Sequence, residues 1–127
     1  MSDAHVTDAA PAGWPREVPP PAAPPFVDRA VLWLLDNAPP EFRGHEVFRK
    51  YPTTLAYAVA HYVEGALNAS REAYSGARRT LGPDVGVEPV EEVLRALEFE
   101  GVRLRKLARE VDLVAEALAG RRWVARL

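Results

Sequence analysis

The residues of this chain that could do chemistry are few and lie far apart in the sequence. The three histidines are His5, His45 and His61, and none of them stands at the spacing of a zinc, haem or di-iron motif. His61 and Glu64 are three positions apart, so on a helix both could reach one metal ion, with His45 as a third ligand. A histidine and a carboxylate on a helix surface are more often only solvated neighbours. We therefore expect no metal site.

The other common catalytic groups are missing or isolated. The chain has no cysteine, which excludes thiol nucleophiles, disulfides and cysteine metal ligands. Ser70 and Ser75 have no obvious histidine partner. Gly82 and Gly86 flank a loop and do not join a strand to a helix, so they do not form a phosphate-binding loop. We expect a protein that is not an enzyme, has no cofactor and has no evident small-molecule substrate.

Composition and charge exclude several further classes. A chain of 127 residues, 48% of them hydrophobic and 27% charged, has room for one core. Its formal net charge of −2 does not attract nucleic acid or anionic lipid to the chain as a whole. The first ten residues lack the basic start and apolar run of a secretory signal, and the apolar run at residues 30–35 is too short to cross a bilayer. We expect a cytoplasmic protein that does not enter a membrane.

The last seven residues, RRWVARL, form the most suggestive short segment. Arg121, Arg122 and Arg126 surround Trp123, and this combination of positive charge and a stacking surface is what contacts to a nucleic-acid backbone use. Alternatively, Trp123 and its apolar neighbours cap the end of the helices, and the overall acidic balance favours this interpretation. We treat residues 121–127 as a basic and aromatic tail and nucleic-acid binding as the alternative function.

A hydrophobic repeat over residues 88–120 organises the chain. Apolar or small residues recur at alternating steps of four and three, which places them on one stripe of a single long helix. Gly120 is well placed to end this helix. The stripe consists of Val90, Leu94, Leu97, Gly101, Leu104, Ala108, Val111, Ala115 and Leu118.

Residues 52–81 carry a second stripe of the same period. Pro52 can open this helix, and Gly82 and Pro83 can end it. Because only a short loop joins the two helices, the sequence predicts an antiparallel hairpin in which Arg78 and Arg79 face Glu91 and Glu92. The second stripe consists of Ala56, Ala60, Val63, Leu67, Ser70, Tyr74, Ala77 and Leu81.

The residues before the hairpin predict two shorter helical pieces and a tail. Residues 26–38 form a first helix that is apolar on most of its circumference, so we expect it to be largely buried. Residues 40–50 form a connector that turns Phe42, Val47 and Phe48 inward. Six prolines within residues 1–24 predict a disordered tail, in which Trp14 folds back on the body or anchors a partner. The fold class is all-α, a bundle of three to four helices over residues 25–120.

The length of the hairpin motivates the predicted function. Two helices of about thirty residues span roughly 45 Å each, and one short helix cannot cover that length. We therefore expect an apolar strip to remain for another chain, with Val93, Leu107, Val114 and Trp123 as its partner-binding residues. The sequence predicts a non-enzymatic module for protein interaction or self-association.

The helix at 88–120 is also strongly polarised in charge. Residues 83–100 carry six acidic and one basic residue, a net charge of −5, whereas residues 101–127 carry seven basic and three acidic residues, a net charge of +4. Compensation of the helix dipole explains part of this asymmetry. A basic binding face explains it equally well.

Overall fold

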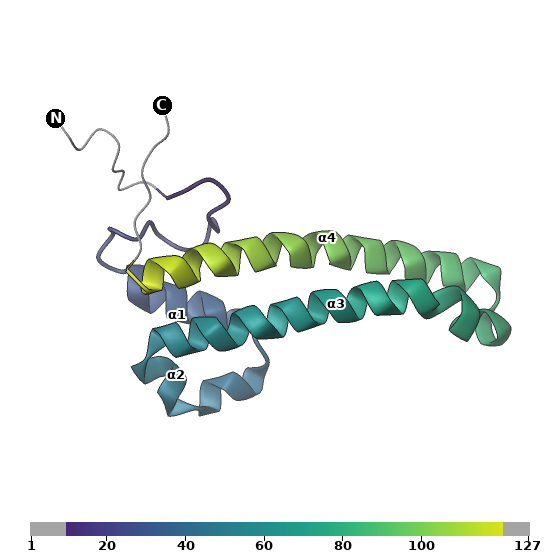
Figure 1. Cartoon of the computed structure of the whole chain (residues 1–127), viewed down its shortest axis with the longest axis horizontal. Coiled ribbons are helices and arrows are strands. Elements are labelled where there is room, and N and C mark those ends of the chain that lie inside the picture. The colour runs from purple at the N-terminus through teal and green to yellow at the C-terminus, as the bar shows by residue number, and fades with distance from the viewer. Residues whose placement is uncertain (1–9, 121–127) are drawn as a thin grey trace. The chain divides into compact units, whose positions relative to one another are not determined.

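The computed structural model describes residues 10–120 of the chain, and all regular structure within them is helical, as the sequence predicts. The two long helices lie side by side and run in opposite directions (Figure 1). In chain order the elements are α1 (Phe26–Asp36), the 3-10 helix η2 (Pro40–Gly44), α2 (Glu46–Lys50), α3 (Pro52–Val85) and α4 (Val87–Leu118).

The chain forms two compact units. Unit 1 consists of the residues up to His61 and those from Arg109 onward, so it contains α1, η2, α2, the first turns of α3 and the last turns of α4. Unit 2, residues Tyr62–Ala108, contains the remainder of α3 and α4 and the turn between them.

The predicted hairpin is confirmed. Every residue of the predicted α4 stripe is buried or half-buried, and so is every residue of the α3 stripe except Tyr74. The helices face each other in the predicted register, because the Arg78 guanidinium donates two hydrogen bonds, of 3.1 and 3.3 Å, to one carboxylate oxygen of Glu91. This ion pair is exposed, so it marks the alignment and contributes only a few tenths of a kcal/mol.

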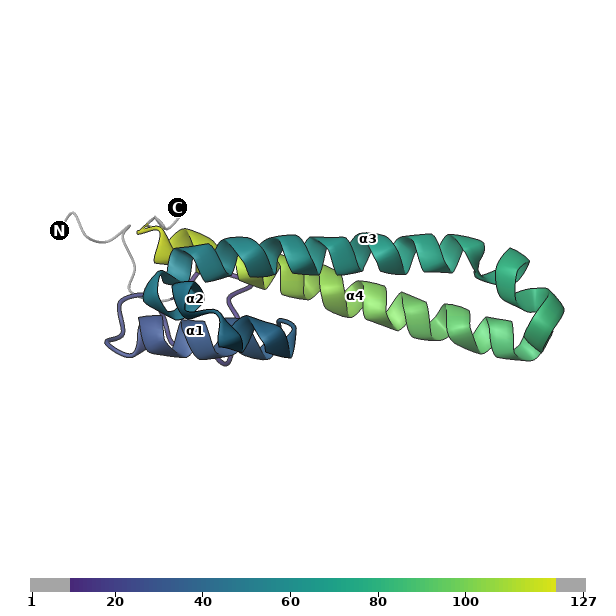
Figure 2. The same ribbon diagram turned by 90° about the horizontal axis from the view of Figure 1, so that it is seen from below.

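The turn between the long helices is shorter than the sequence predicts. α3 continues through Pro83 to Val85, and only Gly86 separates it from α4. A proline this close to a helix end removes one hydrogen bond without stopping the helix, and the ribbon bends over these last turns (Figure 2). Gly86 has φ +87°, a conformation that glycine adopts without a steric cost, so it permits the sharp reversal. Gly120, with φ +84°, follows the end of α4 as predicted.

Residues 10–25 pack against the start of α1 in unit 1. The indole N–H of Trp14 donates a 2.8 Å hydrogen bond to the Val18 carbonyl oxygen, and the Trp14 ring lies 5.8 Å from the ring of Phe26. Pro15 and Val18 are buried. The stretch is free of helix, as its prolines predict, but the prediction of disorder up to residue 24 is wrong here. The prediction that Trp14 folds back on the body is confirmed, and residues 1–9 lie outside the described part.

Helix α1 is amphipathic. It buries Phe26, Ala30, Trp33, Leu34 and Leu35, whereas Val27 and Leu32 are exposed. The prediction that most of its circumference is buried is therefore wrong, because its packing partners cover only one side. The helix ends at Asp36, where the side-chain amide of Asn37 donates a 2.9 Å hydrogen bond to the Trp33 carbonyl oxygen.

The connector divides into η2 and α2 at His45, which has an extended backbone conformation. The rings of Phe42 and Phe48 lie 5.2 Å apart and are half-buried, as predicted. Val47 is exposed, so its predicted inward orientation is wrong. The interruption of the helix at His45 explains this result. Residues before and after His45 do not belong to one continuous helix, so helical spacing does not place them on the same side.

Within residues 10–120, none of the helices combines the length and the hydrophobicity needed to cross a membrane.

Candidate functional site

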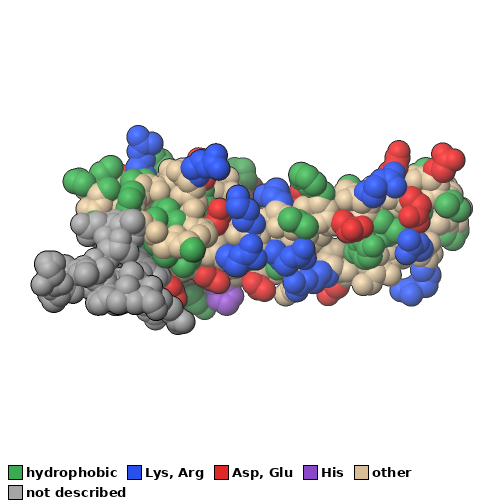
Figure 3. Space-filling model, turned by 90° about the horizontal axis from the view of Figure 1, so that it is seen from above, with side chains coloured by type: hydrophobic (Ala, Val, Ile, Leu, Met, Phe, Trp, Pro, Cys, Tyr) green, Lys and Arg blue, Asp and Glu red, His purple; other side chains and the backbone are tan. Residues whose placement is uncertain are grey.

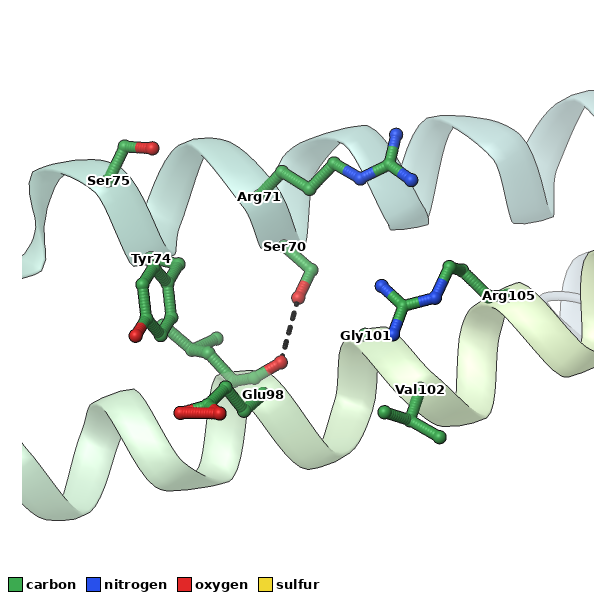
Figure 4. Close-up of a pocket in the computed structure, with 9 residues that line it drawn as sticks. Ser70, Arg71, Tyr74, Ser75, Glu98, Gly101, Val102 and Arg105 are labelled. Carbon is green, nitrogen blue, oxygen red and sulfur yellow. Dashed lines mark hydrogen bonds between the residues drawn. The ribbon is translucent and has the colours of Figure 1, made fainter.

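A hollow lies between α3 and α4 within unit 2 (Figure 4). Its volume is about 320 Å³. The hydroxyl of Ser70 donates a long hydrogen bond of 3.4 Å to the Leu97 carbonyl oxygen across the helix pair. The residues that line the hollow are Ser70, Arg71, Tyr74 and Ser75 on α3 and Leu97, Glu98, Gly101, Val102 and Arg105 on α4.

The hollow exists because the interface at this level contains small residues. Near the turn, Ala77, Val90 and Leu94 form a tight cluster, but further along α3 and α4 the interface offers Ser70 and Gly101. A Cβ atom added at Gly101 would meet only the Nη1 atom of Arg105, at 3.7 Å. The floor of the hollow is therefore bare backbone covered by a movable guanidinium group.

Charged side chains lie at opposite ends of the hollow. Figure 4 shows Glu98 near Tyr74 at one end and the guanidinium groups of Arg71 and Arg105 at the other. Within residues 10–120, neither Glu98 nor Arg105 forms an ion pair. Both charges are exposed and available to groups outside the chain.

Large apolar side chains are exposed at the hollow and beside it. Tyr74 is 37% exposed, Val102 is 60% exposed and Phe99 is 73% exposed. Tyr74 and Val102 line the hollow from the two helices. Phe99 does not line it, but it stands three residues before Val102, so the two side chains are neighbours on α4. We call the hollow together with Phe99 the hollow face. Figure 3 shows that Lys and Arg side chains also gather along the surface of the long helices.

Beside the hollow face, Glu100 and Arg103 form an ion pair of 2.9 Å on α4. The hydrogen bond from Arg103 lowers the pKa of the Glu100 carboxyl, and the same bond raises the pKa of Arg103. These two charges are already partnered within the helix. They therefore offer less to a ligand than Glu98 and Arg105 do.

The predicted partner-binding residues are not on this surface. Val114 is 0% exposed and Leu107 is 8% exposed, so both lie in the interior. Val93 packs against the cluster of Ala77, Val90 and Leu94. The prediction that Leu107 and Val114 belong to an exposed strip is wrong, because here α4 buries a wider face than the regular stripe alone. Val93 is half-buried. Trp123 lies outside the described residues, as do the predicted nucleic-acid residues Arg121, Arg122 and Arg126.

The histidines in the described part contact aromatic rings. His61 lies 4.6 Å from the ring of Tyr57 and His45 lies 5.8 Å from the ring of Phe48. Tyr57 and His61 also border a second hollow, of about 400 Å³, in unit 1, together with Asp112 and Glu116. Within residues 10–120, no group of three histidine or carboxylate side chains is arranged to hold a metal ion.

Sequence reasoning missed Phe99 and the hollow. Phe99 is absent from the regular stripe of α4, but Leu107 and Val114 are also absent from it and are buried. A place outside the stripe therefore did not decide whether Phe99 is exposed. The sequence signal for the hollow was that two small residues, Ser70 in the α3 stripe and Gly101 in the α4 stripe, lie at the same level of the hairpin. No family model, curated protein or solved structure matches the chain, so the surface itself must carry the functional argument.

Proposed function

We propose that this protein is a non-enzymatic helical interaction module whose contact surface is the hollow face of unit 2. The exposure of Phe99 carries the proposal. Burying a phenylalanine side chain stabilises a protein or complex by about 1.5–3 kcal/mol, and 73% of Phe99 faces solvent in the single chain. A partner that covers Phe99 gains this contribution, which is offset in part by the entropy cost of association.

The surroundings of Phe99 support the proposal. Single exposed apolar residues are common on protein surfaces, so one phenylalanine alone would mean little. Here Val102 and Tyr74 extend the apolar surface across both helices, and the hollow beside them provides a concave seat. Interfaces draw most of their energy from a few aromatic anchors that meet such pockets.

The charges around the hollow support contact with a protein. Glu98 and Arg105 have opposite signs, so a ligand with a single sign of charge meets attraction at one end and repulsion at the other. A polypeptide surface can present both signs at once. The hollow face therefore suits a protein partner better than a nucleic acid.

A site-specific cross-link tests the proposal. Benzoylphenylalanine replaces Phe99 in the full chain within its native cells, and irradiation captures whatever lies against the side chain. The control places the same group at Val87, which is also on α4 and is 77% exposed. We expect a discrete cross-linked protein from position 99 that is absent from position 87. No product from position 99, or identical products from both positions, contradicts the proposal.

A further inference from the structure

We infer that the partner of the hollow face is a second copy of this chain, with the two α4 helices antiparallel. This inference rests on the proposed function, because it names the occupant of the same surface. It is carried by the order of charges along α4 and by the bare backbone at Gly101.

Four charges near the middle of α4 are antisymmetric about the bond between Gly101 and Val102. Glu98 stands three residues before Gly101, and Arg105 stands three residues after Val102. The same holds one position away from the centre, where Glu100 precedes Gly101 and Arg103 follows Val102. A two-fold axis through this centre brings Glu98 of one copy to the level of Arg105 of the other, and Glu100 to the level of Arg103. The remaining charges of α4 do not follow this pattern.

Glu98 and Arg105 are the pair that this axis would satisfy. They are seven positions apart, or about 10 Å along the helix axis, and in the single chain neither has an ion-pair partner among residues 10–120. In the antiparallel dimer Glu98 of each copy meets Arg105 of the other, and symmetry forms the pair twice. A parallel arrangement would set like charges against each other, so the pattern selects the antiparallel one.

The shape of the surface agrees with the same axis. The axis brings Val102 of one copy over Gly101 of the other, where no Cβ blocks its approach. In the single chain the Arg105 guanidinium lies over Gly101, 3.7 Å from the position of a Cβ atom. Pairing with Glu98 of the second copy draws this guanidinium aside, so the ion pair and the apolar contact form together.

The available area predicts a reversible dimer. The part of α4 in unit 2 is about 33 Å long, and a face two helices wide measures about 20 Å across. Full coverage therefore buries roughly 650 Å² on each copy, which is near the lower end of stable protein interfaces. We expect monomers and dimers to exchange as the concentration changes.

Charge reversal tests the inference on the purified full chain by sedimentation velocity, from low micromolar to near-millimolar concentration. Glu98→Arg alone and Arg105→Glu alone should each weaken dimerisation by about tenfold or more, because each places like charges together at two symmetric positions. The double variant should dimerise again, and an equimolar mixture of the two single variants should form a mixed dimer. Arg79→Glu, an exposed charge reversal on α3 away from the hollow, serves as the control and should dimerise as the unaltered chain does.

The outcomes separate this inference from the proposed function. A chain that stays monomeric overturns the inference, and so do single variants that dimerise normally or a mixture that fails to recover. If position 99 nevertheless cross-links to a different protein in cells, the hollow face remains an interaction surface with another partner. If position 99 gives no cross-link and the chain is monomeric, both proposals fail.

Discussion

The same two helices are buried differently in the two units. In unit 1, α3 buries Leu55, Ala56 and Val59, and α4 buries Val111, Val114 and Ala117, because α1 and residues 10–25 supply additional packing partners. In unit 2 the helices have only each other, so the buried stripe is narrow and Phe99 and Val102 face water. Unit 1 therefore holds most of the core, and unit 2 presents a surface that has no partner within its own unit.

The largest expected effect is on the free energy of unfolding, when one leucine is shortened to alanine in each unit. Leu34→Ala deletes a fully buried side chain in unit 1 and should lower the free energy of unfolding by about 3–4 kcal/mol. Leu97→Ala removes a half-buried side chain at the hollow in unit 2 and should cost about 1–2 kcal/mol. Urea unfolding at a concentration that keeps the chain monomeric measures both values. Equal losses would contradict the assignment of the main core to unit 1.

Trp14 tests whether the proline-rich segment belongs to that core. Trp14→Ala removes the contact with Phe26 and the hydrogen bond to Val18, and we expect a loss of about 2–3 kcal/mol. Trp14→Phe keeps a ring but loses the N–H donor, so it should cost about 1 kcal/mol. Thermal unfolding of the two variants separates the contributions. An unchanged midpoint for Trp14→Ala would show that the segment does not stabilise unit 1.

Gly101→Ala should move stability and association in opposite directions. Alanine favours a helix over glycine by about 0.5–1 kcal/mol, and its Cβ meets only the Arg105 side chain at an ordinary contact distance. The single chain should therefore become slightly more stable. The same methyl group occupies the place proposed for Val102 of the second copy, so the dimer should weaken. Urea unfolding and sedimentation velocity measure the two effects, and tighter association would contradict the proposed packing.

The regular repeat was sufficient to predict the hairpin and its register. Val90, Leu94 and Leu104 are buried because helical spacing alone decides which side of α4 they occupy. Leu107 and Val114 could not be placed in this way, since their burial goes beyond the regular stripe. Their position depends on tertiary packing, which a helical period does not encode.

The candidate site was less predictable than the fold. The exposure of Phe99 did not follow from its place outside the stripe, because Leu107 and Val114 also lie outside it and are buried. The hollow depends on side-chain volumes at one level of two helices. Taken separately, neither Ser70 nor Gly101 indicates a hollow in the sequence. They define a hollow only when the register sets them in the same layer, so the site follows from the hairpin and not from a local motif.

The smallest expected effect concerns the ion pair of Glu100 and Arg103 in unit 2. It tests whether a surface ion pair adds to the stability that the small apolar core of this unit provides. The hydrogen bond from Arg103 lowers the pKa of Glu100 in the folded chain. Because the pKa of Glu100 is lower in the folded chain than in the unfolded chain, the pair stabilises the folded chain fully when the pH is above the unfolded-state pKa. This stabilisation is lost as the pH falls through the folded-state pKa. The carboxylate is exposed to solvent, so this contribution is small.

Glu100→Gln tests this pH dependence. Its unfolding midpoint should lie slightly below that of the unaltered chain at neutral pH, and the difference should shrink on acidification below the folded pKa of Glu100. Thermal unfolding of both proteins at neutral pH and below the folded pKa of Glu100 measures the change. The control is Glu92→Gln, an exposed carboxylate of α4 that lies beyond the first turn of the helix. A difference that stays constant or grows on acidification would mean that the pair does not stabilise the folded chain. The hairpin of unit 2 would then depend on its narrow apolar stripe and on whatever covers the hollow face.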